Sequence, residues 1–308
     1  MNPERGGVMK AATVTLSRST SIKDILFLTD FSEPSEAAMP FAIGLAREYG
    51  AAVHALHVET PEFYAYSTPE GAAALREAQE EIARNLRRDL DTNLSGIAHD
   101  VTVTRESNVW TAVEDVIYNT SPDLIVLGTR GRTGPRRLIL GSVAEEILRR
   151  SEVPVLTVGP RVSSEITPTA RFSCVLFPTD FTPESLAAEP FAVSFAAKNY
   201  GRLIVYHAMP EPADQKSADS MTMRINRARL DLECIARQGV DGCERRVIVG
   251  CGDPANEILK VADENGVDLI VLGVRDASGS TTLATRVSRA IANKVIANAR
   301  CPVLTVRA

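Results

Sequence analysis

The chain has 308 residues, of which 44% are hydrophobic, 24% charged and 5% aromatic, and its formal net charge is −5. This length is comfortable for two domains of about 150 residues each. The negative charge argues against a dedicated nucleic-acid-binding protein, which would carry a basic surplus, and no apolar run reaches the roughly 20 residues that span a bilayer, so we expect neither nucleic acid nor a membrane as a partner.

The N-terminal stretch, residues 1–21, lacks the uninterrupted apolar run of a secretory signal. We therefore expect a flexible tail on a cytoplasmic protein. The five cysteines form no C-x-x-C pair and are odd in number. This usage is typical of reduced thiols and disfavours a disulfide framework or a zinc site.

The first predicted elements are a short apolar strand at 25–29 and a helix over 34–50. Apolar residues recur in this helix at helical spacing, and Gly50 is typical of a helix stop. Pro40 lies inside the helix and should kink it. A second strand follows at 51–58, and after it comes a longer amphipathic helix.

The rest of this unit continues the alternation of apolar strands and amphipathic helices. Strands that are apolar on both faces indicate a parallel sheet covered by helices on each side. We predict an α/β fold in which five parallel strands with right-handed crossovers form a doubly wound domain. Such sheets bind ligands at the carboxyl ends of their strands. The remaining elements are expected at 101–107, 110–120, 123–128, 143–150 and 153–158.

The second half of the chain repeats the first. Three segments of the first half recur in the same order, with small insertions between them. We therefore predict two tandem domains of this fold, over 22–160 and 172–308. A polar linker at 161–171 separates them. The matching pairs are 25–46 with 175–196, 122–128 with 267–273, and 153–158 with 301–306.

The connection after the fourth strand is rich in glycine, with the spacing G-x2-G-x9-G-S. Each glycine costs ordering entropy and so should have a conformational or close-approach reason. Bare glycine backbone lets N–H groups approach an anion, and the following helix directs its positive N-terminal end to the same place. The pattern therefore favours phosphate binding. Its members are Gly128, Gly131, Gly141 and Ser142.

Other interpretations of these polar residues stay open. The glycines could form a turn without function, and Ser142 could be a helix cap, since it begins an S-x-x-E capping pattern with Glu145. Asp30 follows the first strand and is either a turn residue or an acceptor for ribose or base donors. The nearby arginines either clamp phosphates or are solvated; they are Arg130, Arg132, Arg136 and Arg137.

The sequences "LFLTDFS", "LHV" and "LGTRGRTGPRRLILGS" before "VPVLTV" resemble the universal stress protein family, in its ATP-binding branch. The resemblance covers both halves and implies a fold like that of adenine nucleotide alpha hydrolases, which is Rossmann-like. ATP, with or without Mg²⁺, would lie across the ends of strands one and four. The family's G-x-P turn after strand three is replaced here by residues 106–110. The resemblance implies adenine and ribose contacts with Thr29, Asp30, Val58 and Leu127, and phosphate contacts with Gly128, Gly131, Gly141, Ser142 and Val143.

The second half keeps Thr179, Asp180 and Gly273 but loses the rest of the glycine pattern. Asp276 replaces its second glycine, and Arg289 replaces its third. A carboxylate repels a triphosphate, and arginine cannot give the bare backbone approach of glycine. We predict that this half binds ATP weakly or not at all and acts as a packing or interaction partner.

The function implied is that of a nucleotide-dependent stress-response or regulatory protein. The alternatives are a slow ATPase and an interaction module in which the nucleotide is incidental. The chain lacks G-x4-G-K-[ST], and the four histidines show no metal spacing, so we name no catalytic residue and no metal ligand. The resemblance also implies pairing through the final strand of each domain, either within the chain or in a homodimer.

Overall fold

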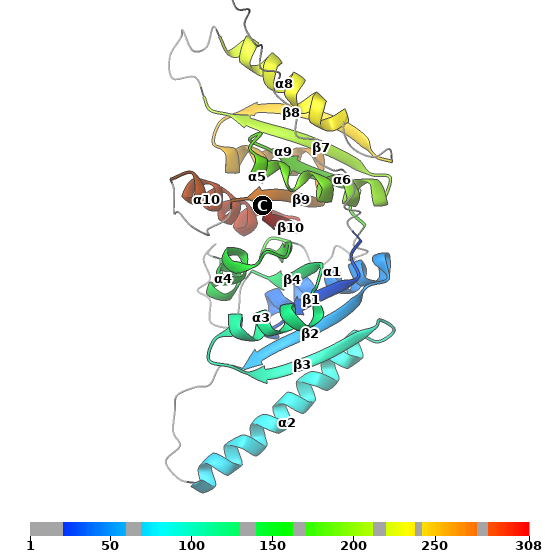
Figure 1. Cartoon of the computed structure of the whole chain (residues 1–308), viewed down its shortest axis with the longest axis vertical. Coiled ribbons are helices and arrows are strands. Elements are labelled where there is room, and N and C mark those ends of the chain that lie inside the picture. The colour runs from blue at the N-terminus through cyan, green and yellow to red at the C-terminus, as the bar shows by residue number, and fades with distance from the viewer. Residues whose placement is uncertain are drawn as a thin grey trace, which may run out of the picture.

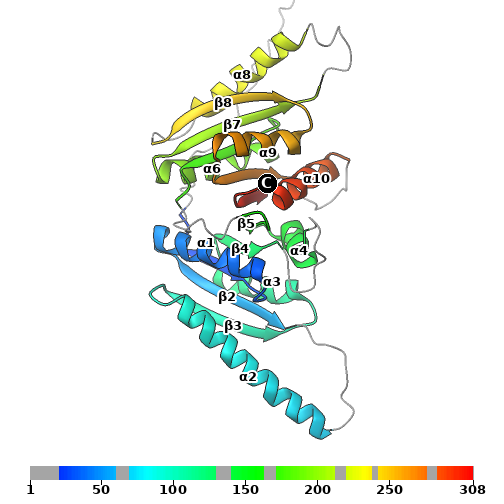
Figure 2. The same cartoon turned by 180° about the vertical axis from the view of Figure 1, so that it is seen from behind.

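A computed structural model describes residues 21–59, 69–129, 140–162, 171–211, 220–237, 242–275 and 283–307. All but the last residue of the expected tail, and most of the expected linker, lie outside these ranges. Two halves of similar architecture follow one another along the long axis of the molecule (Figures 1 and 2). In the described ranges, no helix is long and apolar enough to cross a membrane.

The elements alternate between strand and helix in both halves. The first half contains β1 (Asp24–Leu28), α1 (Glu33–Tyr49), β2 (Ala52–Glu59), α2 (Pro69–Asn93), β3 (His99–Arg105), α3 (Val109–Thr120), β4 (Leu124–Gly128), α4 (Ser142–Arg150) and β5 (Val155–Val158). The second half contains β6 (Cys174–Pro178), α5 (Pro183–Leu186), α6 (Glu189–Lys198), β7 (Arg202–Met209), α8 (Met221–Arg237), β8 (Glu244–Cys251), α9 (Pro254–Asn265), β9 (Leu269–Val274), α10 (Leu283–Asn298) and β10 (Val303–Arg307).

The strands form one sheet in the order β3-β2-β1-β4-β5-β10-β9-β6-β7-β8. Within each half all neighbouring strands are parallel, and the order reverses direction beside the first strand of the half, between β1 and β4 and between β6 and β9. The predicted fold of two tandem doubly wound α/β domains is confirmed. In the first half, the polar residues that follow β1 and β4 therefore lie side by side, at the point where the strand order changes direction.

The strand residues divide between two cores, one on each face of the sheet. On β1, Ile25 and Phe27 face the core shared with α1 and α2, whereas Leu26 and Leu28 face the core shared with α3 and α4. Ile25, Leu26 and Phe27 are fully buried. Burial of each such side chain contributes about 1.5–3 kcal/mol, which explains why these strands are apolar on both faces.

The first helical segment of each half contains a proline at the same position of the repeat, but the helix around it differs between the halves. The prediction that Gly50 ends the first helix is confirmed, because Gly50 caps α1 with φ of 67°. Pro40 lies inside α1, which continues through it. In the second half the corresponding helix is divided into α5 and α6, and Pro190 stands in the first turn of α6. A proline there loses no hydrogen bond, because first-turn amides have no intrahelical acceptor.

The halves are joined by the antiparallel pair β5 and β10. Leu156 lies opposite Leu304, and both are fully buried. The Thr157 hydroxyl donates to the carbonyl of Val303 at 3.0 Å, and the Thr305 hydroxyl donates to that of Val155 at 3.3 Å. Of the two expected pairings of the final strands, the structure shows the one within the chain. β5 also pairs with β4, and β10 with β9, so a second chain could pair here only by displacing one of these strands.

Candidate functional site

The turn after β1 is fixed by a buried threonine. The Thr29 hydroxyl lies 2.9 Å from the hydroxyl of Ser35 and accepts from the amide of Phe31 at 3.1 Å. The Thr29 carbonyl accepts from Nδ1 of His57 at 2.8 Å, and the His57 ring packs edge-on against Phe31. Phe31 has φ of 57°, a left-handed conformation that costs energy for a bulky residue and so needs this support. Thr29 therefore serves mainly to hold the turn.

Asp30 has a structural role in the same turn. Its Oδ1 accepts from the amide of Ser32 at 3.0 Å and from the Ser32 hydroxyl at 2.5 Å. This is the local side-chain-to-backbone bonding by which aspartate stabilises turns. Asp30 is partly exposed at the end of β1, so its turn role leaves a role toward a ligand open.

The second half contains the same turn. Phe181 has φ of 64°, and Asp180 Oδ1 accepts from the amide and the hydroxyl of Thr182. Burial raises the pKa of the Asp180 carboxyl, but hydrogen bonds from Thr182 and Ser185 and the charge of Arg275 outweigh it and hold the pKa below its usual value. The turn thus forms in both halves and does not by itself distinguish a nucleotide-binding half.

The start of α4 lies beside the end of β4. The Gly141 amide donates to the carbonyl of Thr129 at 2.7 Å, which joins the two segments. Gly141 is the N-cap residue and provides no side-chain cap, and the first bond within the helix runs from the amide of Glu145 to the carbonyl of Gly141. The capping role considered for Ser142 is therefore wrong, because Ser142 is the first helical residue. Its amide and those of Val143 and Ala144 have no acceptor within α4.

A second polar group lies at the end of β4. The Thr129 residue is 1% exposed, and its hydroxyl has no hydrogen-bond partner among the described residues. A buried hydroxyl without a partner costs about 1–3 kcal/mol. The equivalent residue in the second half is Val274, which has no hydroxyl to satisfy. Thr129 was not among the predicted site residues.

The apolar site residues belong mainly to the core. Leu127 is 3% exposed and packs with α3 and α4, so its side chain is not presented to a ligand. Val58 is partly buried against the same core. Trp110, from the segment that replaces the family turn, is also buried there, and the Arg150 guanidinium lies 5.4 Å from the centre of its ring.

Gly128 has a packing explanation that can be read from its counterpart. Gly128 pairs with Val158 and Gly273 pairs with Val306, so the two glycines occupy equivalent positions. A side chain at Gly273 would collide with the backbone of α5 at Glu184. A glycine at the end of this strand therefore leaves room for the backbone of the first helix in the same half, whether or not a phosphate is bound.

The start of the last helix is where the halves differ most. Aligning the two halves at Pro154 and Pro302 makes Arg289 the counterpart of Gly141. The same alignment matches Val295 with Ile147, and both are buried. Arg289 lies well inside α10, which begins at Leu283. Its amide is therefore within the helix, and no helix N-terminus stands where the first half has one.

Gly131 and the loop arginines lie outside the described residues, and so does Asp276. The residues that the structure brings together around the end of β4 are Thr129, Gly141, Ser142 and Val143, with Asp30 at the neighbouring strand end. Sequence reasoning missed the supporting roles of Ser32 and Ser35. Their signal was the repeated pattern T-D-F-[ST]-x-x-S, present in both halves at 29–35 and 179–185.

No metal centre accompanies this arrangement in the described part of the chain. No group of three or more His, Cys, Asp or Glu side chains is placed there to hold an ion. His57 and His207 instead donate to the carbonyls of Thr29 and Thr179, at the ends of their strands.

The second half contains one buried group that the first lacks. Tyr206 replaces Leu56, is fully buried, and has a hydroxyl without a partner in the ranges that the structure describes. Gly250 makes room for it, because a side chain there would collide with that hydroxyl. Burial, together with the charges of Glu257 and Cys251, raises the pKa of Tyr206.

We expect Tyr206→Phe to stabilise the protein by about 1 kcal/mol, because it removes a buried hydroxyl that has lost its bonds to water. Urea unfolding of the two proteins measures this difference. The matched control is Tyr200→Phe, since Tyr200 is 87% exposed and should change the unfolding free energy by less than about 0.5 kcal/mol. A clear loss of stability in Tyr206→Phe would mean that the hydroxyl has a partner.

Comparison with known proteins gives one consistent family. The model of the universal stress protein family matches residues 21–159 and 172–307. Universal stress protein MJ0531 of Methanocaldococcus jannaschii is 30% identical over 141 residues, covering 44% of this chain and 81% of the relative, and MJ0577 of the same organism is 29% identical over 157 residues, covering 46% and 96%. The crystal structure of a universal stress protein from Archaeoglobus fulgidus matches 94% of this chain and 99% of its own, with a TM-score of 0.63 at 21% identity.

Proposed function

The chain belongs to the universal stress protein family, and from that premise we propose that its N-terminal half binds ATP, with the triphosphate at the first turn of α4. The domains in this proposal are 22–160 and 172–308. The protein would act as a nucleotide-dependent stress-response or regulatory protein, and its C-terminal half as the packing partner.

The observation that carries the proposal is the uncapped start of α4. The amides of Ser142, Val143 and Ala144 have no acceptor in the helix, and Gly141 provides no capping side chain. Free amides at the positive end of a helix form a site for phosphate. Gly141 has φ of −64°, a conformation open to any residue, so close approach is a better reason for a glycine here than backbone strain.

The Thr129 hydroxyl supports the same assignment. It is buried beside Gly141 and lacks a partner among the residues that the structure describes. A phosphate oxygen is an acceptor that would satisfy it. Several charge-assisted hydrogen bonds of about 1.5–3 kcal/mol each would supply the roughly −8 kcal/mol of a micromolar complex.

Isothermal titration of the whole chain with ATP and Mg²⁺ tests the proposal. We expect one ATP per chain with a dissociation constant in the micromolar range. The same titration with GTP asks whether the base is recognised. A chain that takes up no ATP would refute the function, and a chain that takes up two would refute the difference between the halves.

A further inference from the structure

A small hollow lies where the two halves meet. It is enclosed by α4 of the first half and by α10 and the ends of β9 and β10 of the second, and it measures about 440 Å³, including space open to solvent. Four arginines line it, two from helices and two from strand ends. They are Arg149, Arg275, Arg289 and Arg307.

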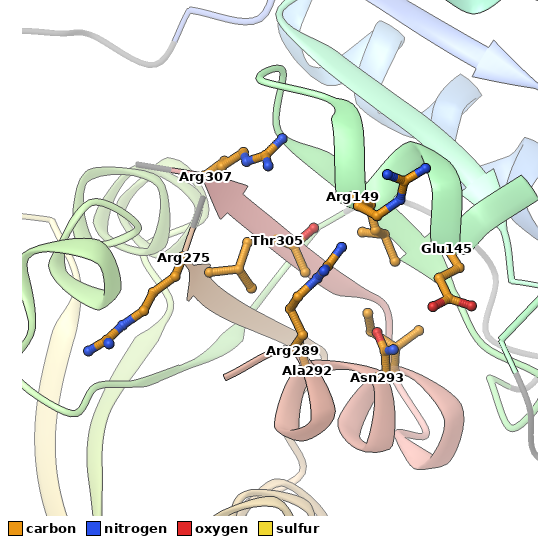
Figure 3. Close-up of a pocket in the computed structure, with 11 residues that line it drawn as sticks. Glu145, Arg149, Arg275, Arg289, Ala292, Asn293, Thr305 and Arg307 are labelled. Carbon is orange, nitrogen blue, oxygen red and sulfur yellow. The ribbon is translucent and has the colours of Figure 1, made fainter. Parts of the chain in front are cut away.

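Figure 3 shows how these side chains lie. Arg149, Arg289 and Arg307 surround Thr305, each from a different element, whereas Arg275 points to the other side. Arg275 is 4.0 Å from the carboxylate of Glu184, which accounts for its direction. The hollow thus presents three guanidinium groups together.

Among the described residues, little negative charge offsets the guanidinium groups of Arg149 and Arg289. Arg289 has no ion pair or hydrogen bond with any described residue, and the carboxylate nearest to Arg149 is that of Glu146, on its own helix at 3.8 Å. Arg307 donates to the carbonyl of Ser151 at 3.4 Å. Glu145 is the one carboxylate among the lining residues, and it points away from the three guanidinium groups (Figure 3). In a chain with a net charge of −5, this grouping is a local exception.

The equivalent place on the other side of the β5–β10 pair has different residues among those that the structure describes. The counterpart of Arg307 is Gly159, where an added Cβ would lie 2.6 Å from the carbonyl oxygen of Ile296 in α10. Helix and strand are therefore in close contact there. Arg289 and Arg149 likewise have Gly141 and Ala297 as counterparts. The arginine cluster is thus not a product of the repeat.

We propose that this hollow binds a phosphate group, as free phosphate or pyrophosphate or as the phosphate tail of a nucleotide held by α4. Guanidinium groups form paired, charge-assisted hydrogen bonds with phosphate oxygens. The amide of Asn293 on α10 adds a neutral donor. Because α4 contributes Arg149 and α10 contributes Arg289, an occupant would contact both halves at once.

The test is calorimetric titration of the whole chain with inorganic pyrophosphate. Arg289→Ala should weaken binding about tenfold or more, whereas Arg289→Lys, which keeps the charge, should lose less. The matched control is Arg237→Ala, since Arg237 is an 81% exposed arginine of α8 whose loss should leave binding unchanged. Gly131→Val, which changes the glycine pattern predicted to bind ATP, should also leave pyrophosphate binding unchanged.

Two results would overturn the proposal: no binding of pyrophosphate by the wild-type chain, or equal binding by wild type and Arg289→Ala. Loss of pyrophosphate binding in Gly131→Val, with binding by Arg289→Ala unchanged, would also overturn it, because the anion would then bind at the glycine pattern after β4. ATP titration then separates the two sources. If Arg289→Ala also weakens ATP binding, the occupant is the nucleotide's tail, and if ATP binding is unchanged, it is a free phosphate compound.

Discussion

Replacing Asp30 with alanine is expected to weaken ATP binding by about tenfold to a hundredfold, whereas replacing Asp180 with alanine should leave it unchanged. The first change would remove a carboxylate that accepts hydrogen bonds from the ribose or base, and a bond to a charged group contributes about 1.5–3 kcal/mol. The second removes the same group from the half whose last helix runs through the phosphate position.

This pair is informative because the two aspartates make matching hydrogen bonds within their turns. Asp30 accepts from the amide and hydroxyl of Ser32, and Asp180 accepts from those of Thr182. Each variant should therefore lose a similar amount of stability, about 1–2 kcal/mol, by thermal or urea unfolding. A difference in ATP affinity between variants of equal stability can then be attributed to ligand contact.

Calorimetry with ATP on both variants and on Asp30→Asn measures the effect. Asn keeps a turn acceptor but not the charge, so we expect its affinity to lie between those of wild type and Asp30→Ala. Equal affinities for Asp30→Ala and Asp180→Ala would contradict the assignment of Asp30 to the ligand and would leave it as a turn residue only.

Replacing Leu304 with alanine should cost about 2–5 kcal/mol of unfolding free energy, the range for removing a large side chain from a packed core. Leu304 is fully buried and lies opposite Leu156 across the join between the two halves. Because β5 and β10 belong to one continuous sheet, amide hydrogen exchange should accelerate in both strands and not in β10 alone.

The control is Leu230→Ala on α8, where the side chain is 57% exposed and a change below about 0.5 kcal/mol is expected. A loss in Leu304→Ala no larger than in this control would mean that the join contributes little to stability. Faster exchange confined to the second half would mean that the halves unfold independently.

Much of the fold could be predicted from the sequence because its signals are local. Strand β1 is apolar on both faces since it lies between two helical layers, and Gly50 ends α1 because glycine accepts a left-handed conformation. Because the second half repeats the first, the same elements could be predicted there. The join between β5 and β10 was left open between one chain and two, because apolar final strands suit either pairing.

The site could be predicted less completely, because several of its residues act through contacts that sequence spacing does not show. Leu127 and Gly128 were predicted as ligand residues from their position, and the structure shows packing roles that spacing does not reveal: Leu127 is buried in the core, and the counterpart of Gly128 leaves room for a helix. The predicted loss of ATP binding in the second half rested on the Asp276 carboxylate, which lies outside the described residues, and on the Arg289 side chain. The structure adds a feature that the sequence did not predict at this position, since α10 extends past Arg289 to Leu283.

The hollow between the halves was beyond sequence reasoning altogether. Its arginines come from α4, α10 and β10, which are distant in the chain, and they meet only because the sheet is continuous across the join. None of the three belongs to a motif.

A crystal structure of the whole chain with ATP is the most direct test of the central claim, that a free helix start in one half binds a triphosphate while a continuous helix in the other half cannot. The account predicts phosphate oxygens within hydrogen-bond distance of the amides of Ser142 and Val143, and no nucleotide with its base and ribose at the ends of β6 and β9 in the second half. Nucleotide bound at the ends of β6 and β9, with the start of α4 vacant, would contradict it.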